Sequence, residues 1–149
     1  MKLWPKLGRP GRASNMVVVL DCNIWITLTI NSELDFIAGL FENETEIASC
    51  DTLKGEILDV LNRPRLRKYI NPSEIVKVTE LHDLVTTYYK PGKLLKVTTD
   101  PKDHYLFALS VKSKADFLVT GDKLLLAVGR FKNTGVISLG NFRSIASNP

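Results

Sequence analysis

The chain has 149 residues, of which 44% are hydrophobic and 24% are charged. This length suits one domain that buries about two-thirds of the surface of its unfolded chain. The composition is that of a folded globular protein and excludes a disordered one. The apolar runs are only a few residues long, so the sequence predicts no membrane-spanning helix.

The formal net charge of +4 comes from one end of the chain. Residues 1–15 contain four basic residues and no acid, whereas basic and acidic residues balance in the rest. The same segment has prolines and glycines but no helical or strand periodicity. We therefore expect a flexible basic leader over residues 1–15 and a single domain over residues 16–149. Met16 directly precedes the first predicted strand and could be the start of translation, so the leader is given no function.

The cysteine content points to a reducing compartment. Cys22 and Cys50 are the only cysteines, and the two histidines are far apart in the sequence. This set is too small for a structural zinc site, and buried reduced thiols are the simpler interpretation. The sequence thus predicts a cytoplasmic protein without disulfides.

Short apolar runs alternate with helical patterns along the chain. The expected strands are 16–21, 46–50, 94–97, 116–120 and 135–139, and the expected helices are 34–41, 51–62, 71–89, 101–114, 123–128 and 142–146. Strands that alternate with helices, with few hairpin signals, indicate a parallel sheet covered on both faces. The fold class is therefore α/β, a three-layer α/β/α sandwich with a central parallel sheet.

The helix over residues 71–89 has the clearest boundary signals. Asn71 can cap its start, Pro72 suits the first turn, and Glu74 occupies the third position of a capping box. Pro91 and Gly92 should end it.

Carboxylates follow two of the predicted strands. Asp21 ends the run VVVL, and Asp122 follows DFLVT. The carboxyl ends of parallel strands meet at one edge of the sheet, where open α/β folds hold their ligands. We expect both carboxylates at that edge.

A third carboxylate lies in the helix over residues 51–62. Its apolar stripe contains Leu53, Ile57, Val60 and Leu61, and Glu56 occupies the missing position of that stripe. A buried carboxylate needs a cation, a donor or access to solvent. Two explanations of Glu56 are equally good: it lies at the margin of the stripe, where its carboxylate reaches solvent or an ion pair, or it belongs to a functional site.

A fourth carboxylate opens the helix over residues 101–114. Asp100 suits the cap, and Asp103 falls at the third helical position, where an acid favours the helix dipole. Capping explains Asp100 fully. Asp103 also heads a stripe with Phe107 and Ser110, which directs it partly inward and toward the same edge of the sheet.

Four carboxylates at one place would repel one another and raise their own pKa values unless a cation lay between them. Mg²⁺ and Mn²⁺ prefer such oxygen ligands, and their sites catalyse phosphodiester cleavage by activating water. The candidate metal ligands and catalytic residues are Asp21, Glu56, Asp103 and Asp122. Asn23 and Thr120 could orient a carboxylate or a metal-bound water from outside the ligand set.

The segments VVVLDCN, LKGEILDVLNRPRLRKYI and DPKDHYLFALSVKSKADFLVTGDKLLL, in this order, resemble the PIN (PilT N-terminus) domain family. The similarity is greatest to stand-alone prokaryotic toxins of the VapC type. It implies a Rossmann-like fold and a ribonuclease dependent on Mg²⁺ or Mn²⁺, with Asp21, Glu56, Asp103 and Asp122 as metal ligands. It also implies a homodimer neutralised by a partner antitoxin.

The sequence departs from the family pattern at two positions. Many members have a small hydroxyl residue where this chain has Cys22, and many have a further acid where it has Leu124. The first change should matter little. The second removes an extra ligand and bears on whether one or two metal ions bind.

A basic cluster follows the helix that carries Glu56. Its members are Arg63, Arg65, Arg67 and Lys68. Short charge runs are usually solvated helix ends, but an acidic nuclease site needs positive charge nearby to hold RNA phosphates. We therefore favour weak RNA binding by this cluster.

Two other functions are compatible with parts of the pattern. A receiver-like phosphoacceptor domain also has an acidic Mg²⁺ site, and VTGDK offers its hydroxyl and lysine, but the paired acids after the first strand are missing. A catalytically idle domain that binds RNA or a protein partner would not need to keep the acids.

Overall fold

The computed structural model describes residues 16–92 and 103–147. Within this part of the chain, six strands form one sheet in the order β3-β2-β1-β4-β6-β5. They are β1 (Met16–Leu20), β2 (Thr45–Ser49), β3 (Thr86–Tyr88), β4 (Phe117–Val119), β5 (Arg130–Phe131) and β6 (Thr134–Ile137). All neighbouring pairs are parallel except β5 and β6.

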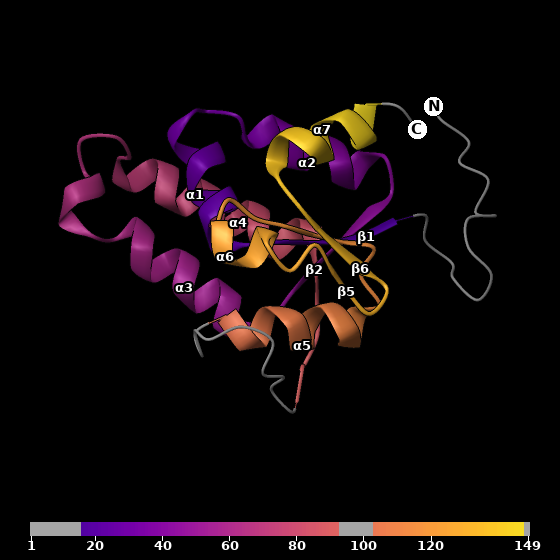
Figure 1. Ribbon diagram of the computed structural model, residues 1–149. Helices are drawn as coiled ribbons and strands as arrows, with labels where there is room; N and C mark the ends of the chain where they lie inside the picture. Colours follow the sequence, from indigo (N-terminus) through magenta and orange to yellow (C-terminus); the bar gives the residue numbers. More distant parts are fainter. Residues whose placement is uncertain (1–15, 93–102, 148–149) are drawn as a thin grey trace.

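Helices cover both faces of this sheet. The described helices are α1 (Cys22–Ile30), α2 (Leu34–Glu42), α3 (Asp51–Leu61), the short 3₁₀ helix η1 (Pro64–Leu66), α4 (Pro72–Val85), α5 (His104–Ser113), α6 (Lys123–Leu126) and α7 (Leu139–Ser147). Helix α5 packs on β1, β2 and β4, and α2 and α7 lie over the opposite face (Figure 1). The predicted three-layer α/β/α sandwich with a central, mostly parallel sheet is confirmed.

Strand β1 is the centre of the sheet because it is apolar on both sides. The residues from Val17 to Leu20 are at most 2% exposed. Val18 lies opposite Ile47 of β2 and Phe117 of β4. A strand buried on both faces reads as a continuous apolar run, which is why VVVL forms the middle of a parallel sheet.

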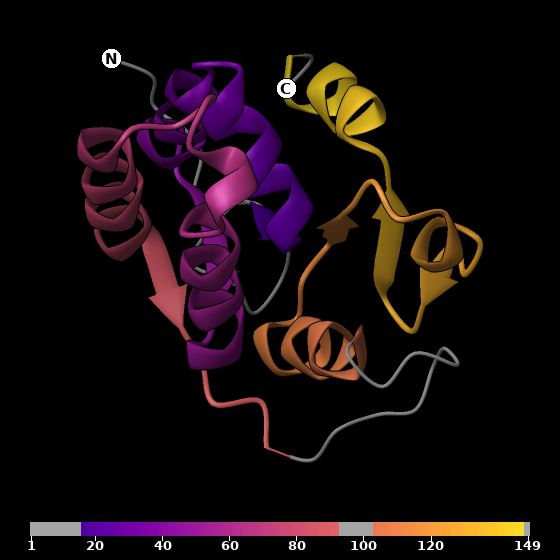
Figure 2. The ribbon, with the colours of Figure 1, turned by 90° about the vertical axis from the view of Figure 1, so that its left-hand side faces the viewer.

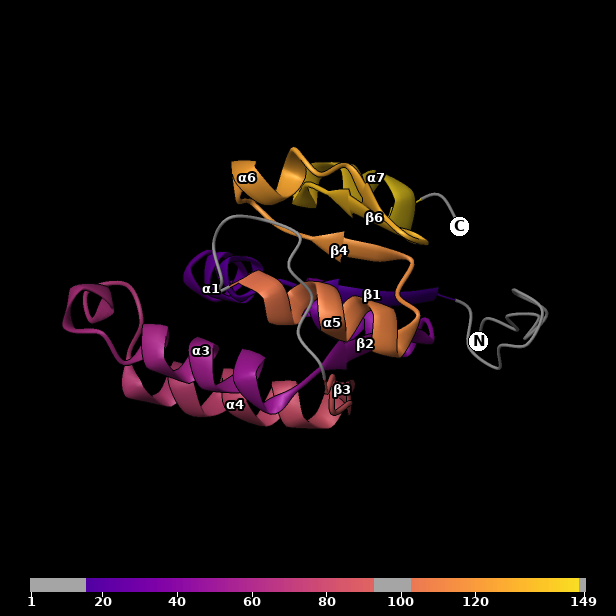
Figure 3. The ribbon, with the colours of Figure 1, turned by 60° about the horizontal axis from the view of Figure 1, so that its bottom comes forward.

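The parallel direction of β1, β2 and β4 brings three helix starts to one edge of the sheet. Helix α1 follows β1, α3 follows β2, and α6 follows β4. Helices α3 and α4 run side by side near the β3 end of the sheet (Figure 3). On the other side of α3 lies the first turn of α5 (Figure 2). The residues after the three strands therefore face a common region.

Large aromatic side chains fill the core between the layers. Trp25, Phe107 and Phe142 are fully buried. The Phe142 ring meets Phe36 of α2 edge-on at 6.0 Å, and the Phe107 ring meets Phe131 at 5.3 Å.

Among the described residues no single helix is long and apolar enough to cross a membrane, and α1 and α2 reach that length only together, as a pair bent by 117°.

Helix α1 is absent from the sequence prediction. Its residues, CNIWITLTI, are rich in β-branched side chains and have no apolar stripe at helical spacing. The structure shows the reason, because Trp25 and Leu28 are fully buried and Thr29 is only 2% exposed. Burial around most of its circumference removes the amphipathic pattern by which a helix is recognised.

The helix predicted over residues 71–89 is shorter than expected. Its capping box is present, since Asn71 Oδ1 accepts from the Glu74 amide at 2.9 Å and Glu74 Oε1 accepts from the Asn71 amide at 3.0 Å. The helix ends at Val85, however, and the next three residues form β3, with Thr86 opposite Ile47. Pairing with the edge of β2 overrides continuation of the helix.

Asp103 lies in a 3₁₀ turn directly before α5, with φ −95° and ψ −8°. Its place at the third helical position stays a prediction, because residues 101 and 102 lie outside the described part of the chain. Strand β5 and its antiparallel pairing with β6 were not expected, because a two-residue strand gives no period-two pattern. The strand predicted over residues 94–97 and the cap at Asp100 lie outside the described residues.

Candidate active site

Asp21 lies at the junction of β1 and α1. Its backbone is extended, and its Oδ1 atom caps the helix by accepting a hydrogen bond from the Cys22 amide at 2.6 Å. The residue is only 7% exposed. A central strand and a helix start thus fix this carboxylate at the carboxyl edge of the sheet.

Thr120 and Asn23 connect Asp21 to the loop after β4. The Thr120 hydroxyl donates to Asp21 Oδ2 at 2.7 Å and accepts from the Asp122 amide at 3.0 Å. Asn23 Nδ2 donates to the same Oδ2 atom at 3.2 Å, and Asn23 Oδ1 accepts from the Gly121 amide at 3.1 Å. These bonds orient the Asp21 carboxylate and hold the loop that carries Asp122 beside it.

Asp122 begins α6 in the same way that Asp21 begins α1. Its Oδ1 atom accepts from the Leu124 amide at 2.8 Å, and its backbone is extended. The residue is half-buried. Both strand-end aspartates are therefore helix caps, and capping is a sufficient structural reason for each of them on its own.

Glu56 is half-buried within the apolar face of α3. Leu53 and Ile57 of this face are 0% and 3% exposed. The Tyr105 hydroxyl, from the first turn of α5, donates a hydrogen bond to Glu56 Oε1. The carboxylate therefore has the donor that its partial burial requires.

Tyr105 is the site residue that the sequence did not reveal. It is 6% exposed, and burial raises its pKa above the ordinary value, with the hydrogen bond to Glu56 adding to the rise. The phenol thus remains a hydrogen-bond donor at neutral pH. The sequence signal is a hydroxyl-bearing side chain in a buried apolar helix, two residues after Asp103. Its partner lies 49 positions away, which no local pattern indicates.

Negative charge is concentrated around Asp21. Burial raises the pKa of the Asp21 carboxyl, and the charges of Glu56 and Asp122 raise it further, while the bonds from Thr120 and Cys22 oppose the rise. Three of the four predicted carboxylates are therefore close enough to interact electrostatically. Asp103 lies half-buried just before α5, two residues from Tyr105, and its approach to the other three stays a prediction.

The donor chemistry of this cluster fits a hard divalent cation. All the donors are carboxylate oxygens, and their mutual repulsion is the condition that a bound cation relieves. Among residues 16–92 and 103–147, however, no three Asp, Glu, His or Cys side chains form a ready ligand group. The four-acid metal site accordingly stays a prediction.

The predicted basic cluster lies on the surface, directly after α3 in the chain. All four side chains are outside the core: Arg63, Arg65, Arg67 and Lys68 follow α3 around η1 and are exposed. Burial raises the pKa of the Cys22 thiol to about 12, the charges of Glu56 and Asp21 add to this, and the Arg63 charge opposes it. The Arg63 charge therefore reaches Cys22, and its guanidinium pairs with Asp59 at 3.3 Å.

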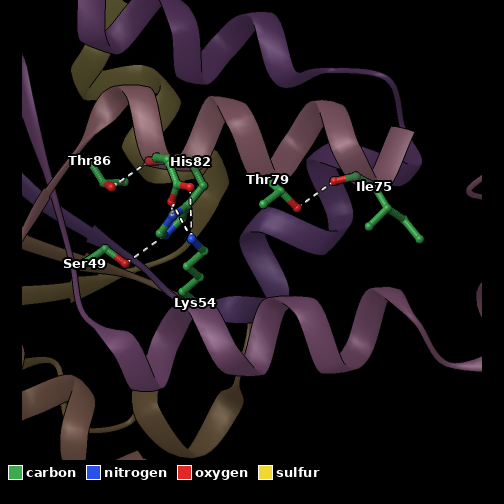
Figure 4. A network of polar contacts seen from close by, with 7 residues as sticks. Ser49, Lys54, Ile75, Thr79, His82 and Thr86 are labelled. Carbon is green, nitrogen blue, oxygen red and sulfur yellow. Dashed lines mark hydrogen bonds and ion pairs between the residues drawn. The ribbon is translucent and has the colours of Figure 1, made fainter. Parts of the chain in front are cut away.

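A second polar group lies between β2 and α4. Ser49 Oγ is 2.8 Å from His82 Nε2, and His82 Nδ1 is 3.6 Å from Asp83 Oδ1, which Lys54 Nζ approaches to 2.8 Å (Figure 4). A serine, a histidine and an aspartate in series suggest a nucleophile, but Ser49 is 0% exposed. A substrate has no access to this hydroxyl, so the group ties α4 to the sheet.

The buried histidine predicts a pH dependence of stability. Burial lowers the pKa of His82 below its ordinary value of 6.5, partly opposed by Asp83. The unfolded chain therefore binds a proton more readily than the folded one, and stability is lost as the pH falls below 6.5. The slope contributed by this one group is at most about 1.4 kcal/mol per pH unit. The free energy of unfolding, measured by urea denaturation between pH 7.5 and 5, should depend less steeply on pH in a His82→Leu variant. An equally steep pH dependence in the two proteins would contradict this role of His82.

An α/β domain with carboxylates after its central parallel strands carries them at the edge of the sheet where open α/β folds bind their ligands. The sequence matches a family model described as PIN domain over residues 17–124. The chain therefore belongs to the PIN domain family. PIN domains are generally nucleases, and these nucleases generally use divalent metal ions. This membership removes the basis of the receiver-like alternative.

Solved structures with the same fold are distant in sequence. The crystal structure of PAE2754 from Pyrobaculum aerophilum superposes with a TM-score of 0.66 at 13% identity, over 90% of this chain and 91% of the other. The crystal structure of VapBC2 from Rickettsia felis, bound to a DNA fragment from the VapBC2 promoter, gives a TM-score of 0.55 at 14% identity, over 83% of this chain and 98% of the other. No curated protein matches the sequence. At these identities the likeness shows the fold.

Proposed function

We propose that the protein is a metal-dependent endoribonuclease that hydrolyses RNA phosphodiester bonds. The observation that carries this proposal is the electrostatic coupling of Asp21 with Glu56 and Asp122 at the carboxyl edge of the sheet. The charges of Glu56 and Asp122 oppose the ionisation of Asp21. A cation bound at this edge of the sheet would offset that repulsion.

The residues have separate roles in this proposal. Asp21, Glu56, Asp103 and Asp122 would hold Mg²⁺ or Mn²⁺. The bound cation would supply a hydroxide at neutral pH and offset the charge that develops on the phosphate. Thr120 and Asn23 keep Asp21 Oδ2 in one orientation through two hydrogen bonds. The reaction would be a hydrolysis in which the oxygen of water forms the new P–O bond, the bond to the leaving oxygen breaks, and that oxygen takes up a proton.

The exposed basic cluster would bind the RNA backbone. Arg63, Arg65, Arg67 and Lys68 carry positive charge past the end of α3, and the Arg63 charge reaches the thiol next to Asp21. Phosphate contacts of this kind do not depend on sequence and weaken as salt rises. They would hold an anionic substrate against an acidic site.

The proposal extends to partners and location. The solved VapBC2 structure is bound to a promoter DNA fragment, and it has the fold of this chain. We propose a cognate antitoxin protein for this chain, a homodimer as its assembly, and the cytoplasm, where RNA is present, as its compartment. Co-purification with the product of the adjacent reading frame tests the antitoxin, and light scattering tests the homodimer.

Purified protein tests the activity directly. We expect cleavage of a structured RNA with Mg²⁺ or Mn²⁺ and no cleavage with EDTA. Cleavage that survives EDTA would overturn the metal dependence. A protein that neither cleaves RNA nor binds Mn²⁺ in calorimetric titration would be the idle binding domain.

The Thr120 hydroxyl gives a second, sharper prediction. Thr120→Val keeps the side-chain volume but removes the donor to Asp21 and the acceptor for the Asp122 amide. We expect cleavage to fall about 10- to 100-fold, the usual cost of losing a bond that orients a metal ligand.

Thr120→Ser is the matched control, because it restores the hydroxyl and loses only a methyl group. It should keep most of the activity. If the serine variant is as impaired as the valine variant, the effect comes from packing and the orienting role is wrong.

A further inference from the structure

The connection between α3 and α4 is a projection of the molecule, and we call residues 63–70 the basic projection. It includes η1 and extends beyond the other elements at the side where α3 ends (Figure 3). Leu66 packs against the core, and Ile70 is 3% exposed. The amides of Leu66, Tyr69 and Ile70 donate to backbone carbonyls of the same segment at 2.9 Å. The core and these bonds therefore fix its shape before any ligand binds.

The charge of the basic projection is positive and mostly unpaired. Its exposed cations are Arg63, Arg65, Arg67 and Lys68. No acid occurs in the sequence between Asp59 and Glu74. Among residues 16–92 and 103–147, Arg63 is the only one of the four cations in an ion pair, with Asp59 at 3.3 Å. The other three charges can therefore bind an anionic ligand at no cost in internal ion pairs.

Tyr69 adds an exposed aromatic ring to these charges. It is 53% exposed, and Lys68 Nζ lies 5.3 Å from the centre of its ring. A single exposed apolar side chain is common on protein surfaces. A ring beside several free cations is more specific, because a nucleotide likewise has a flat base beside an anionic phosphate. Aromatic side chains stack on any unpaired base, whereas the bases of a duplex already stack on one another.

The basic projection and the candidate active site can be spanned by one RNA strand. Glu56 and Arg63 are about two helical turns apart along α3, which is roughly 10 Å. The charge of Arg63 also reaches the thiol of Cys22, the residue after Asp21. An RNA strand bound to the projection can therefore continue toward the carboxylates.

We propose that the basic projection is a binding site for single-stranded RNA, in which Tyr69 stacks on an unpaired base while the neighbouring cations bind the phosphates. This inference rests on the proposed function, because it takes RNA as the substrate. It goes further in assigning base recognition to a residue outside the carboxylate cluster. The contacts involve no metal ion, so binding can be measured without cleavage.

Fluorescence anisotropy in EDTA tests the proposal with two probes, a labelled oligouridylate and a labelled RNA duplex. Tyr69→Ala should weaken binding of the oligouridylate by about 5-fold or more. Binding of the duplex should be unchanged, because the cations hold its phosphates and its bases are not free to stack. Tyr69→Phe keeps the ring and should bind both probes like the wild type.

Two further variants separate the ring from the charge. Phe41→Ala is the matched control, since it removes an aromatic side chain that is 46% exposed on α2, and it should bind both probes like the wild type. Arg67→Gln should weaken binding of both probes and lower the slope of log affinity against log salt by about 1. Thermal unfolding verifies that each variant folds.

The outcomes separate this inference from the proposed function. Unchanged binding of the oligouridylate by Tyr69→Ala overturns the role of Tyr69, and so does an equal loss for oligouridylate and duplex, even if the wild type cleaves RNA. A wild type that binds neither probe also overturns it. Conversely, a protein that binds the oligouridylate through Tyr69 but cleaves no RNA with Mg²⁺ or Mn²⁺ overturns the endoribonuclease function and leaves this inference standing.

Discussion

Asp21→Asn is expected to abolish RNA cleavage, with a loss of at least about 100-fold, or roughly 3 kcal/mol of transition-state stabilisation. Asp21 is 7% exposed and is fixed by three donors, the Cys22 amide, Thr120 and Asn23. An amide at this position is neutral and offers one oxygen, so it binds Mg²⁺ or Mn²⁺ more weakly than a carboxylate does.

The variant should nevertheless fold with no loss of thermal stability. The charge that it removes is disfavoured in the wild type, because burial and the neighbouring charges of Glu56 and Asp122 raise the Asp21 pKa. The amide oxygen can still accept from the Cys22 amide and cap α1. A loss of activity in an intact fold is the signature of a residue placed for chemistry.

Cleavage of a fluorescent RNA in Mn²⁺, together with a thermal unfolding curve, measures both effects. Asp35→Asn is the matched control. Asp35 is exposed on α2, so this substitution makes the same chemical change away from the site. That variant should cleave like the wild type. Activity of Asp21→Asn equal to that of the control would remove Asp21 from the catalytic residues.

The strand-end carboxylates could be located from the sequence because local and global signals agree there. VVVL is a continuous apolar run, and such a run in a parallel sheet has its carboxyl end at the edge where ligands bind. The structure places Asp21 and Asp122 at this edge, each also as a helix cap. The capping role explains why an acid is compatible with folding at these positions.

Contacts between segments that are distant in the sequence could not be predicted from any local pattern of residues. The pairing of Tyr105 with Glu56 depends on how α3 and α5 pack, and each residue taken alone is an ordinary member of a helix. The sequence showed only that Glu56 interrupts an apolar stripe and must have a partner. The structure supplies that partner from another helix.

Helix α1 and strand β3 were missed for a related reason. Both are determined by tertiary contacts: α1 by burial of Trp25 and Leu28, and β3 by pairing of Thr86 with Ile47. Intrinsic propensity favours a strand for the residues of α1 and continuation of α4 through β3. Packing outweighs propensity in both cases, because propensity differences are below about 1 kcal/mol per residue.

Trp25 connects the core to the site, and its truncation should have the largest effect on stability. Its side chain is 0% exposed, one helical turn from Asp21, and its ring lies 4.9 Å from that of His82 on α4. Trp25→Ala leaves a large cavity between α1 and α4. We expect the free energy of unfolding to fall by about 3–5 kcal/mol, measured by urea denaturation at neutral pH.

Two variants separate the causes of this loss. Leu84→Ala removes an apolar side chain that is 70% exposed on α4, so it should change the free energy of unfolding by less than about 0.5 kcal/mol. Trp25→Phe keeps a ring and removes Nε1, which has no hydrogen-bond partner among the described residues. Removal of an unsatisfied donor offsets part of the lost packing, so this variant should lose less than half as much as Trp25→Ala. Equal losses in the two Trp25 variants would contradict the prediction that the volume filled by the ring determines the loss.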